Sequence, residues 1–417
     1  MKTSHIRNVV LALAALAVPF QASAQPQIEG AEQIDQVRRD SRIHLGPLYA
    51  SPTILLKELG VDSNVFNAAG EQQSDFTFTV GPKVDVWLPV ARRALFQGTA
   101  ATDLVYYATH DSERSINPQF SASGEIYLRR ITVFGGGDYL NSRQRLNYEV
   151  DLRARHVERG GVAGVALRLT PKLSVEAAAR RREIEFDGDA QFDGVALQRT
   201  LNQATTGFSL TGKHHVTPLS TLVVRFERLE DEFEFSPARD SKSFRVMPGV
   251  EFKPRALVSG RAYVGYRRFT PTAAGLLPEF SGLVAQLGLS YTLLGATTFG
   301  VSYSRDLTYS YEERQPFFID DSVGLSVRRA LGRRFDVLVS ADRHVYTYEN
   351  LLTQEATAGT TLPQRQDITW NYTGSIGYRI GQGRVGVGVS YWERSSALKI
   401  FRDYDNLRFG TTVTYGF

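Results

Sequence analysis

The chain has 417 residues, of which 42% are hydrophobic and 22% charged, and its mean hydropathy lies just below zero. This balance predicts a folded protein and excludes a disordered one. After the first two dozen residues no run of about 18 apolar residues occurs, so no helical membrane span is expected. A net charge of +4 is too small to indicate nucleic acid as a partner. The absence of cysteine excludes disulfides, thiolate metal sites and a cysteine nucleophile.

Residues 1–24 have the features of a secretory signal peptide. Lys2 and Arg7 give a positive start, residues 9–20 are apolar, and residues 22–24 read Ala-Ser-Ala, a small-residue cleavage site. The apolar stretch is about a dozen residues long, whereas a bilayer span needs about 20. The sequence therefore predicts export by a cleaved signal. The polar residues 25–46 that follow are expected to form a periplasmic segment, either a disordered tail or a short helix.

A period of two runs through the remaining residues. At the C-terminus, one face carries Leu407, Phe409, Thr411, Val413, Tyr415 and Phe417, and the other carries only polar residues and glycine. The same alternation recurs in 283–293, 296–309 and 384–392. In 296–309 it assigns Phe299, Val301, Tyr303 and Leu307 to the apolar face. This pattern predicts β-strands with one apolar and one polar face, because a helix would mix the two sets.

The connections between these strands alternate in length. Short turns at 91–93, 129–130, 170–172, 217–219, 253–255, 294–295, 332–334 and 381–383 alternate with long polar loops. Short turns on one rim and long loops on the other are typical of bacterial outer-membrane barrels. We therefore predict an all-β fold, a transmembrane up-and-down antiparallel β-barrel of about 18 strands over residues 47–417. A soluble sandwich or lectin also alternates, but its strands are shorter than the roughly 12 residues indicated here.

The last strand also matches a C-terminal assembly signal. Phe409, Val413, Tyr415 and Phe417 share one face and end the chain on an aromatic residue. This resembles the signal by which the insertion machinery recognises outer-membrane barrels. The sequence therefore indicates that machinery as a partner, together with outer-membrane lipids and lipopolysaccharide around the finished barrel.

Two short motifs near the start of the barrel resemble a known family. Residues 59–66, LGVDSNVF, and residues 74–82, SDFTFTVGP, are similar to a porin-like outer-membrane β-barrel family often associated with exopolysaccharide gene clusters. The resemblance implies a Gram-negative outer-membrane barrel of porin type. It also implies a conduit for exopolysaccharide export, with polysaccharide and periplasmic export components as partners.

If the apolar face meets lipid, the polar face lines the lumen. The lining residues predicted by this rule are Glu176, Arg180, Arg182, Arg225, Glu227, Arg261, Tyr263, Arg267, Asp306, Asp342 and Arg384. Charged rings set the ion selectivity of pores, and the arginine majority indicates a weak preference for anions. Alternatively, these groups pair with one another across the lumen and stiffen the wall.

Catalytic and metal-binding motifs are weak. His110, Asp111 and Ser112 bring the groups of a hydrolase together, but three neighbours in one loop rarely form a catalytic relay. Asp187, Asp189 and Asp193 share a loop but lack the ligand series of a calcium site. No glycine-rich phosphate loop occurs, so no cofactor is expected.

We predict a passive channel that is not an enzyme. The alternatives are a closed structural or adhesive barrel and a lipid-modifying hydrolase, and conductance separates the channel from the closed barrel.

Overall fold

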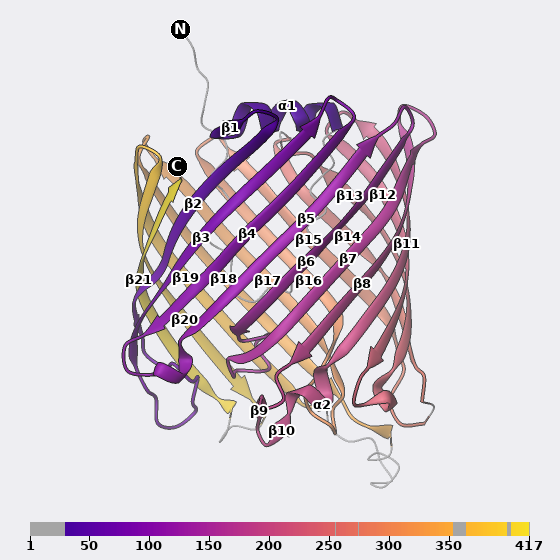
Figure 1. Cartoon of the computed structure of the whole chain (residues 1–417). Coiled ribbons are helices and arrows are strands. Elements are labelled where there is room, and N and C mark those ends of the chain that lie inside the picture. The colour runs from indigo at the N-terminus through magenta and orange to yellow at the C-terminus, as the bar shows by residue number, and fades with distance from the viewer. Residues whose placement is uncertain (1–29, 255, 274, 353–363, 398–401, 417) are drawn as a thin grey trace.

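The computed structural model describes residues 30–416 except 255, 274, 353–363 and 398–401; the predicted signal peptide and Phe417 lie outside these residues. Eighteen long antiparallel strands pair in chain order, and the last strand closes on the first (Figure 1). The prediction of an up-and-down barrel of about 18 strands is confirmed. The strands are β2 (Leu48–Asp62), β3 (Asp75–Val90), β4 (Ala94–Tyr107), β5 (Ser115–Tyr127), β6 (Ile131–Gln144), β7 (Ala154–Arg168), β8 (Leu173–Phe186), β11 (Gln203–Thr217), β12 (Ser220–Phe233), β13 (Ser241–Phe252), β14 (Val258–Pro271), β15 (Phe280–Leu293), β16 (Thr297–Tyr309), β17 (Phe317–Leu331), β18 (Phe335–Glu349), β19 (Gln366–Ile380), β20 (Gly383–Ser396) and β21 (Tyr404–Gly416).

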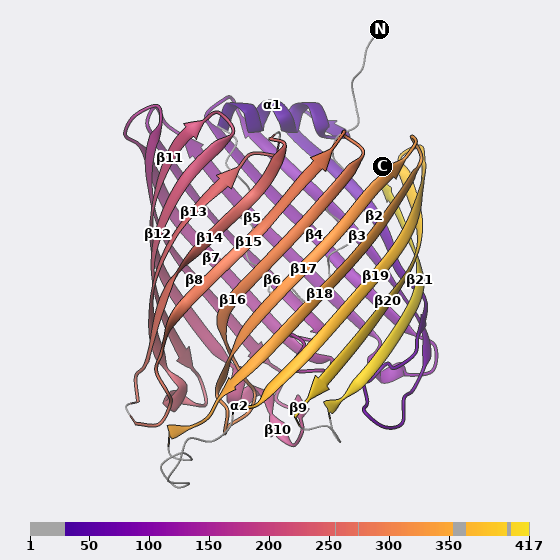
Figure 2. The same ribbon diagram turned by 180° about the vertical axis from the view of Figure 1, so that it is seen from behind.

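The two rims of the barrel differ. One carries the short turns, and the other carries the longer loops with the small elements η1 (Asp111–Glu113), β9 (Gln191–Phe192), β10 (Val195–Ala196), α2 (Leu197–Leu201) and η2 (Pro237–Arg239). Figures 1 and 2 show the loop rim at the bottom and the turn rim, with α1 and the C-terminus, at the top. Short turns face the periplasm in such barrels, so the loop rim is the extracellular one.

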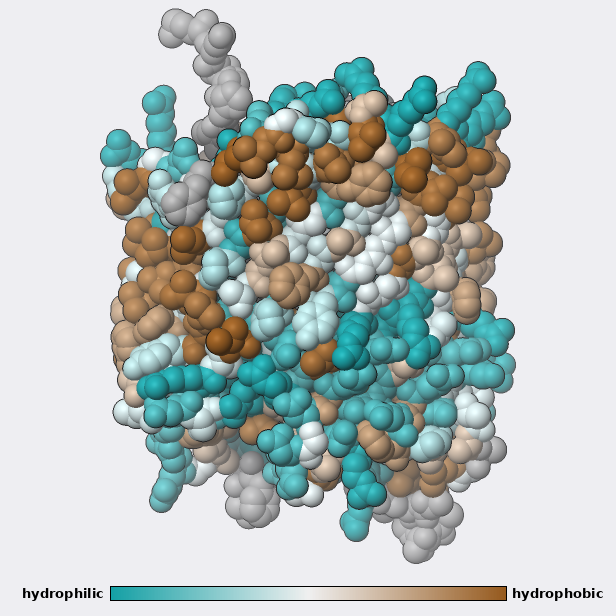
Figure 3. Space-filling view, in the orientation of Figure 1, coloured by the Kyte–Doolittle hydropathy of each residue, from teal (hydrophilic) through white to brown (hydrophobic). Residues whose placement is uncertain are grey.

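The outer surface of the wall carries an apolar band because alternate apolar residues point outward. On β12, Leu222, Val224 and Phe226 are 51%, 40% and 42% exposed, whereas Val223 between them is 1% exposed. Figure 3 shows hydrophobic residues gathered on the half of the wall near α1, with hydrophilic residues nearer the extracellular loops. An apolar outer band without open strand edges is the form in which a sheet can cross a bilayer. No helix in the described part of the chain is long and apolar enough to span a membrane.

A helix, α1 (Gly30–Asp40), and a short strand, β1 (Ile43–Leu45), precede the barrel. Ile34 and Val37 of α1 are buried against Leu95 on the lumen face of β4. The Asp35 carboxylate forms an exposed ion pair with Arg92 in the first periplasmic turn. The N-terminal segment thus contains a short helix that packs on the inner wall at the periplasmic rim.

One part of the wall departs from simple alternation. The period of two predicts that Leu307 faces lipid with Phe299 and Val301, and this is wrong. Phe299 and Val301 are 42% and 41% exposed, but Leu307 is 7% exposed and packs with Phe233 and other aromatic residues. The extracellular end of β16 bends into the barrel. The side of the strand that faces lipid at Phe299 and Val301 is therefore buried inside the barrel at Leu307.

Candidate functional site

Five charged side chains from β8, β12, β13, β14 and β16 form a row on the lumen face. Arg180 donates to Glu227 at 2.9 Å, and Arg245 forms a 3.3 Å ion pair with the same carboxylate. Asp306 accepts from Arg245 at 2.6 Å and from Arg267 at 2.7 Å. We call these residues the arginine row. The predicted lining residues Arg180, Glu227, Arg267 and Asp306 therefore meet in one network.

The other predicted lining residues lie elsewhere on the inner wall. Glu176 accepts from Lys213 at 2.9 Å, and Arg182 donates to Glu158. The Arg225 guanidinium lies 5.2 Å from the centre of the Tyr263 ring, whose hydroxyl donates to Glu251. Arg384 donates to Asp336 at 3.0 Å, Arg261 lies opposite Glu251, and Asp342 lies opposite Gly324 and Asn371. Most of these charges pair with groups on nearby strands of the wall rather than with one another across the lumen, and the arginine row is richer in cations than in anions.

Arg245 was missed by the sequence reasoning although the same rule identifies it. It shares a face with Met247 and opposes Phe244, which is 50% exposed on the outer side. The alternation of 241–252 therefore carried the necessary signal. The inward bend of β16, which brings Asp306 to Arg245, carries no comparable signal because Leu307 continues the period of two.

The loop between β6 and β7, residues 145–153, crosses the extracellular mouth. We call it the mouth loop. The Tyr148 ring lies 4.8 Å from the ring of His344 on β18. Because β18 is the ninth strand from β7 in both directions around the barrel, this contact joins opposite walls. At the near wall, Arg145 donates to the Val65 carbonyl at 2.7 Å.

Arg394 holds the mouth loop in place. Its guanidinium is fully buried, and it donates to the carbonyls of Tyr148 and Glu149 and to the Asp151 carboxylate, the last at 2.6 Å. It also donates to the Asp367 carboxylate at 2.7 Å. Buried ions are stable only when well paired, so this network fixes the loop in one position. Removal of either partner leaves an uncompensated buried charge.

An apolar cluster joins three extracellular loops. Val150 of the mouth loop, Leu197 and Leu201 of α2, and Tyr311 of the loop after β16 are each at most 4% exposed and pack together. Arg402 stacks at 5.0 Å on the Tyr311 ring. Part of the extracellular mouth is therefore occupied by a small hydrophobic core formed by the loops. Burial of such a core stabilises the interlocked position of the loops.

One carboxylate in the mouth is poorly accommodated. Glu149 is 0% exposed, and its Oε1 accepts from the Ser310 hydroxyl at 2.6 Å. Its Oε2 is buried and accepts no hydrogen bond from the described residues. Burial raises the pKa of Glu149 to about 7, although the Ser310 hydrogen bond and the nearby guanidiniums of Arg394, Arg402 and Arg365 lower it.

His110 does not form the relay considered for a hydrolase. Its Nδ1 lies 2.8 Å from an oxygen of the Asp75 carboxylate, and its Nε2 lies 2.9 Å from Gln73 Oε1. Both ring nitrogens are thus engaged by groups other than the Ser112 hydroxyl. Asp75 was not recognised from the sequence because it is 35 residues from His110 and begins a different strand.

The acidic loop of 187–193 is engaged in ion pairing. Asp193 accepts from Arg402 at 2.5 Å and from the Tyr311 hydroxyl at 3.4 Å. Among the described residues, no three His, Cys, Asp or Glu side chains converge as metal ligands would. These contacts connect the loop to the hydrophobic core of the mouth.

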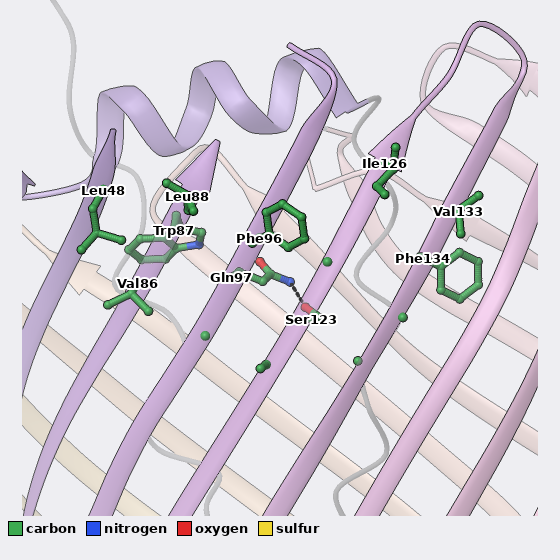
Figure 4. A pocket seen from close by; sticks show the side chains of 15 residues that line it. Leu48, Val86, Trp87, Leu88, Phe96, Gln97, Ser123, Ile126, Val133 and Phe134 are labelled. Atoms are coloured by element: carbon green, nitrogen blue, oxygen red, sulfur yellow. Dashed lines mark hydrogen bonds between the residues drawn. The ribbon is translucent and has the colours of Figure 1, made fainter. Parts of the chain in front are cut away.

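A groove of about 660 Å3 lies on the wall near α1 (Figure 4). Phe96, Ile126 and Val133 line it from successive strands and are 40–43% exposed on the lipid-facing side. The Phe96 ring lies over Gly124, where an added Cβ would meet the ring at 2.7 Å. An apolar groove at this position suits lipid chains. It lies on the outer face of the wall and so is not part of a path for solutes through the lumen.

A closed barrel with an apolar exterior and a charged interior defines a membrane-spanning protein of channel type. The chain belongs to the family described as "Putative beta-barrel porin 2", whose model matches residues 43–409. This confirms the expected porin-like outer-membrane barrel family. No curated protein sequence matches the chain.

Several solved structures are similar to this chain at low sequence identity. OpdO of Pseudomonas aeruginosa has a TM-score of 0.49 and 11% identity, over 88% of this chain and 97% of that one. OccK5 (OpdH) of the same organism has a TM-score of 0.47 and 11% identity, over 89% and 98%. A bacterial polysaccharide outer membrane secretin has a TM-score of 0.36 and 9% identity, over 90% and 100%.

Proposed function

We propose that the protein is a passive outer-membrane channel whose extracellular mouth opens and closes. The observation that supports this most directly is the contrast between a charged lumen wall and a mouth loop that spans it. A barrel of 18 strands encloses more volume than its side chains fill, which leaves room for an aqueous path. The interlocked loops form the closed position of that path.

The open channel is proposed to prefer anions weakly. The arginine row contains Arg180, Arg245 and Arg267 but only two carboxylates. Arg225 lies two residues from Glu227 on β12, toward the periplasmic rim. Guanidinium groups in a confined space raise the local concentration of anions. The preference is weak because the two carboxylates neutralise part of this charge.

Planar-bilayer recordings of the purified full chain test the proposal. We expect discrete conductance steps and a reversal potential, under a potassium chloride gradient, that indicates chloride preference. Arg180→Gln should shift that potential toward zero. Arg159→Gln is the matched control, because this exposed arginine pairs with Glu185 on the outer face and should leave selectivity unchanged. Clear cation preference in the wild type contradicts the anion preference, and the absence of any conductance contradicts the channel.

Export of exopolysaccharide is the more specific form of this proposal. Its support is an aromatic pair on the lumen side, Tyr148 and His344, which are partly exposed and whose ring centres lie 4.8 Å apart; the buried Tyr346 ring lies 5.9 Å from His344. Aromatic faces and arginines suit sugar rings. Deletion of the gene should then leave polymer in the periplasm, and complementation should restore secretion. Normal secretion without the protein contradicts this form alone.

A closed structural barrel is the second candidate. The observation that favours it is the hydrophobic core of the mouth, in which Val150, Leu197 and Tyr311 are fully buried. In that case the protein conducts no ions under any tested pH or voltage. Conductance therefore separates the two candidates.

A further inference from the structure

The wall splits between β15 and β16 near the extracellular rim. Their ladder runs from Leu293 opposite Thr297 to Ala285 opposite Arg305 and ends there. β15 continues to pair with β14 as far as Phe280, and β16 continues to pair with β17 as far as Tyr309. Residues 280–284 of β15 and 306–309 of β16 therefore belong to consecutive strands of the barrel but form no ladder with each other.

The end of β16 lies on the lumen side of the preceding strands. Arg267 on the lumen face of β14 donates to the Leu307 carbonyl at 3.4 Å. The Tyr309 hydroxyl donates to Asp231 of β12 at 2.9 Å and lies 2.6 Å from the Ser241 hydroxyl of β13. These contacts reach across two to four strands. They are possible only because β16 crosses inside the wall.

This position places Asp306 between two guanidinium groups. The Arg267 side chain is 5% exposed and the Arg245 side chain 15% exposed. Each donates to one oxygen of the Asp306 carboxylate, at 2.7 and 2.6 Å. Two convergent guanidiniums match the planar, two-oxygen shape of a carboxylate. Without Asp306, the arginine row would keep three guanidiniums and the single carboxylate of Glu227.

We propose that Arg245 and Arg267 form a binding site for a small carboxylate solute and that Asp306 occupies this site in the closed channel. A solute carboxylate replaces both ion pairs of Asp306 with equivalent ones. The released end of β16 then pairs with the open edge of β15, and new ladder hydrogen bonds offset the loss of its contacts inside the barrel. The proposal rests on the proposed channel function, because the solute reaches the row through the lumen.

The edge of β15 is suited to this exchange. Continuation of the register from Ala285 and Arg305 would place Leu283 opposite Leu307. In the closed position the Leu283 carbonyl accepts instead from Arg305 Nε at 3.2 Å, and the Leu283 side chain is 65% exposed on the outer face. Leu307 faces outward in the paired state by the same parity. Each leucine therefore has a lipid-facing position available once the strands pair.

Disulfide trapping tests the exchange, and the cysteine-free chain permits it without background. In the full-length variant L283C/L307C, crosslinking requires β16 to pair with β15. We expect crosslinking to be faster in benzoate than in chloride at equal ionic strength. Without benzoate, Asp306→Asn should accelerate crosslinking about tenfold, which corresponds to a loss of about 1.4 kcal/mol from the stability of the closed position. The control L287C/Y303C joins residues already paired and should crosslink equally fast in all conditions.

Each outcome separates this site from the channel function. If neither benzoate nor Asp306→Asn changes the rate for L283C/L307C, the site is wrong whether or not the protein conducts. If benzoate accelerates crosslinking in a protein without conductance, the site stands and the channel proposal fails. Loss of the benzoate effect in Arg245→Met, with the control pair still crosslinked, shows that the effect passes through the arginine row.

Discussion

The two ends of the barrel are narrowed in different ways. At the periplasmic rim, α1 rests on the wall through Ile34 and Val37, and its ion pair between Asp35 and Arg92 is exposed. At the extracellular rim, the mouth loop is held by the fully buried Arg394 and by an apolar core shared among three loops. The periplasmic end uses apolar contacts and an exposed ion pair, whereas the extracellular end adds buried charge.

This difference has consequences for motion. Apolar contacts weaken gradually as the packed side chains move apart. A buried ion pair, in contrast, is stable only while its charged partners stay within contact distance. We therefore expect the extracellular mouth to have two distinct positions, one with the network formed and one with it broken. The periplasmic helix has no such requirement, and we expect it to influence passage less.

The largest expected effect comes from removal of the mouth loop. Replacement of residues 146–152 by Gly-Ser-Gly deletes Glu149 and Val150 and frees Arg394 from its loop carbonyls. Single-channel conductance should rise several-fold, because the loop joins opposite walls. Shortening the loop between β14 and β15 by the same number of residues is the control and should change conductance little. Equal conductance in the two variants would show that the mouth loop does not limit passage.

The wall was predictable from sequence because the membrane imposes alternation on it. Leu222, Val224 and Phe226 must face lipid, so Arg225 and Glu227 must face inward. Most of the arginine row follows from this single rule. The rule applies as long as a strand has lipid on one side and the lumen on the other.

The extracellular mouth was not predictable in this way. Leu307 obeys the alternation yet is buried, because the bend of β16 replaces lipid with Phe233 and Phe269 as its neighbours. The mouth loop has no period at all, and its partner Arg394 lies 245 residues from Glu149. Contacts of this kind depend on which loops meet across the lumen, and a local pattern does not contain that information.

A smaller effect concerns pH at the mouth. Burial raises the pKa of Glu149 from 4.5 to about 7 in the closed position, so that position binds a proton more tightly than the open one. The closed state is therefore favoured in acid and loses this advantage as the pH rises from about 4.5 to 7, by about 3 kcal/mol in all. Bilayer recordings should show a higher open probability at pH 8 than at pH 5.

Glu149→Gln should remove most of this pH dependence and keep the channel closed more of the time at pH 8. The other groups around the carboxyl are Ser310, Tyr348 and the guanidiniums of Arg239, Arg365, Arg394 and Arg402. Glu71→Gln in the exposed loop after β2 serves as the control and should behave like the wild type. An unchanged pH profile in Glu149→Gln would assign the dependence to another group.

The smallest expected effect concerns the attachment of α1 at the periplasmic rim. Ile34→Ala removes a fully buried side chain and should weaken docking by at least about 2 kcal/mol. Asp35→Asn removes an exposed ion pair, which contributes at most about 1 kcal/mol. Trypsin cleavage after Arg38 and Arg39 reports undocking, because a protease needs the helix to unfold locally. Cleavage should be more than tenfold faster in Ile34→Ala and nearly unchanged in Asp35→Asn. The reverse order would mean that charge holds the periplasmic helix too, and the contrast between the two ends of the barrel would then disappear.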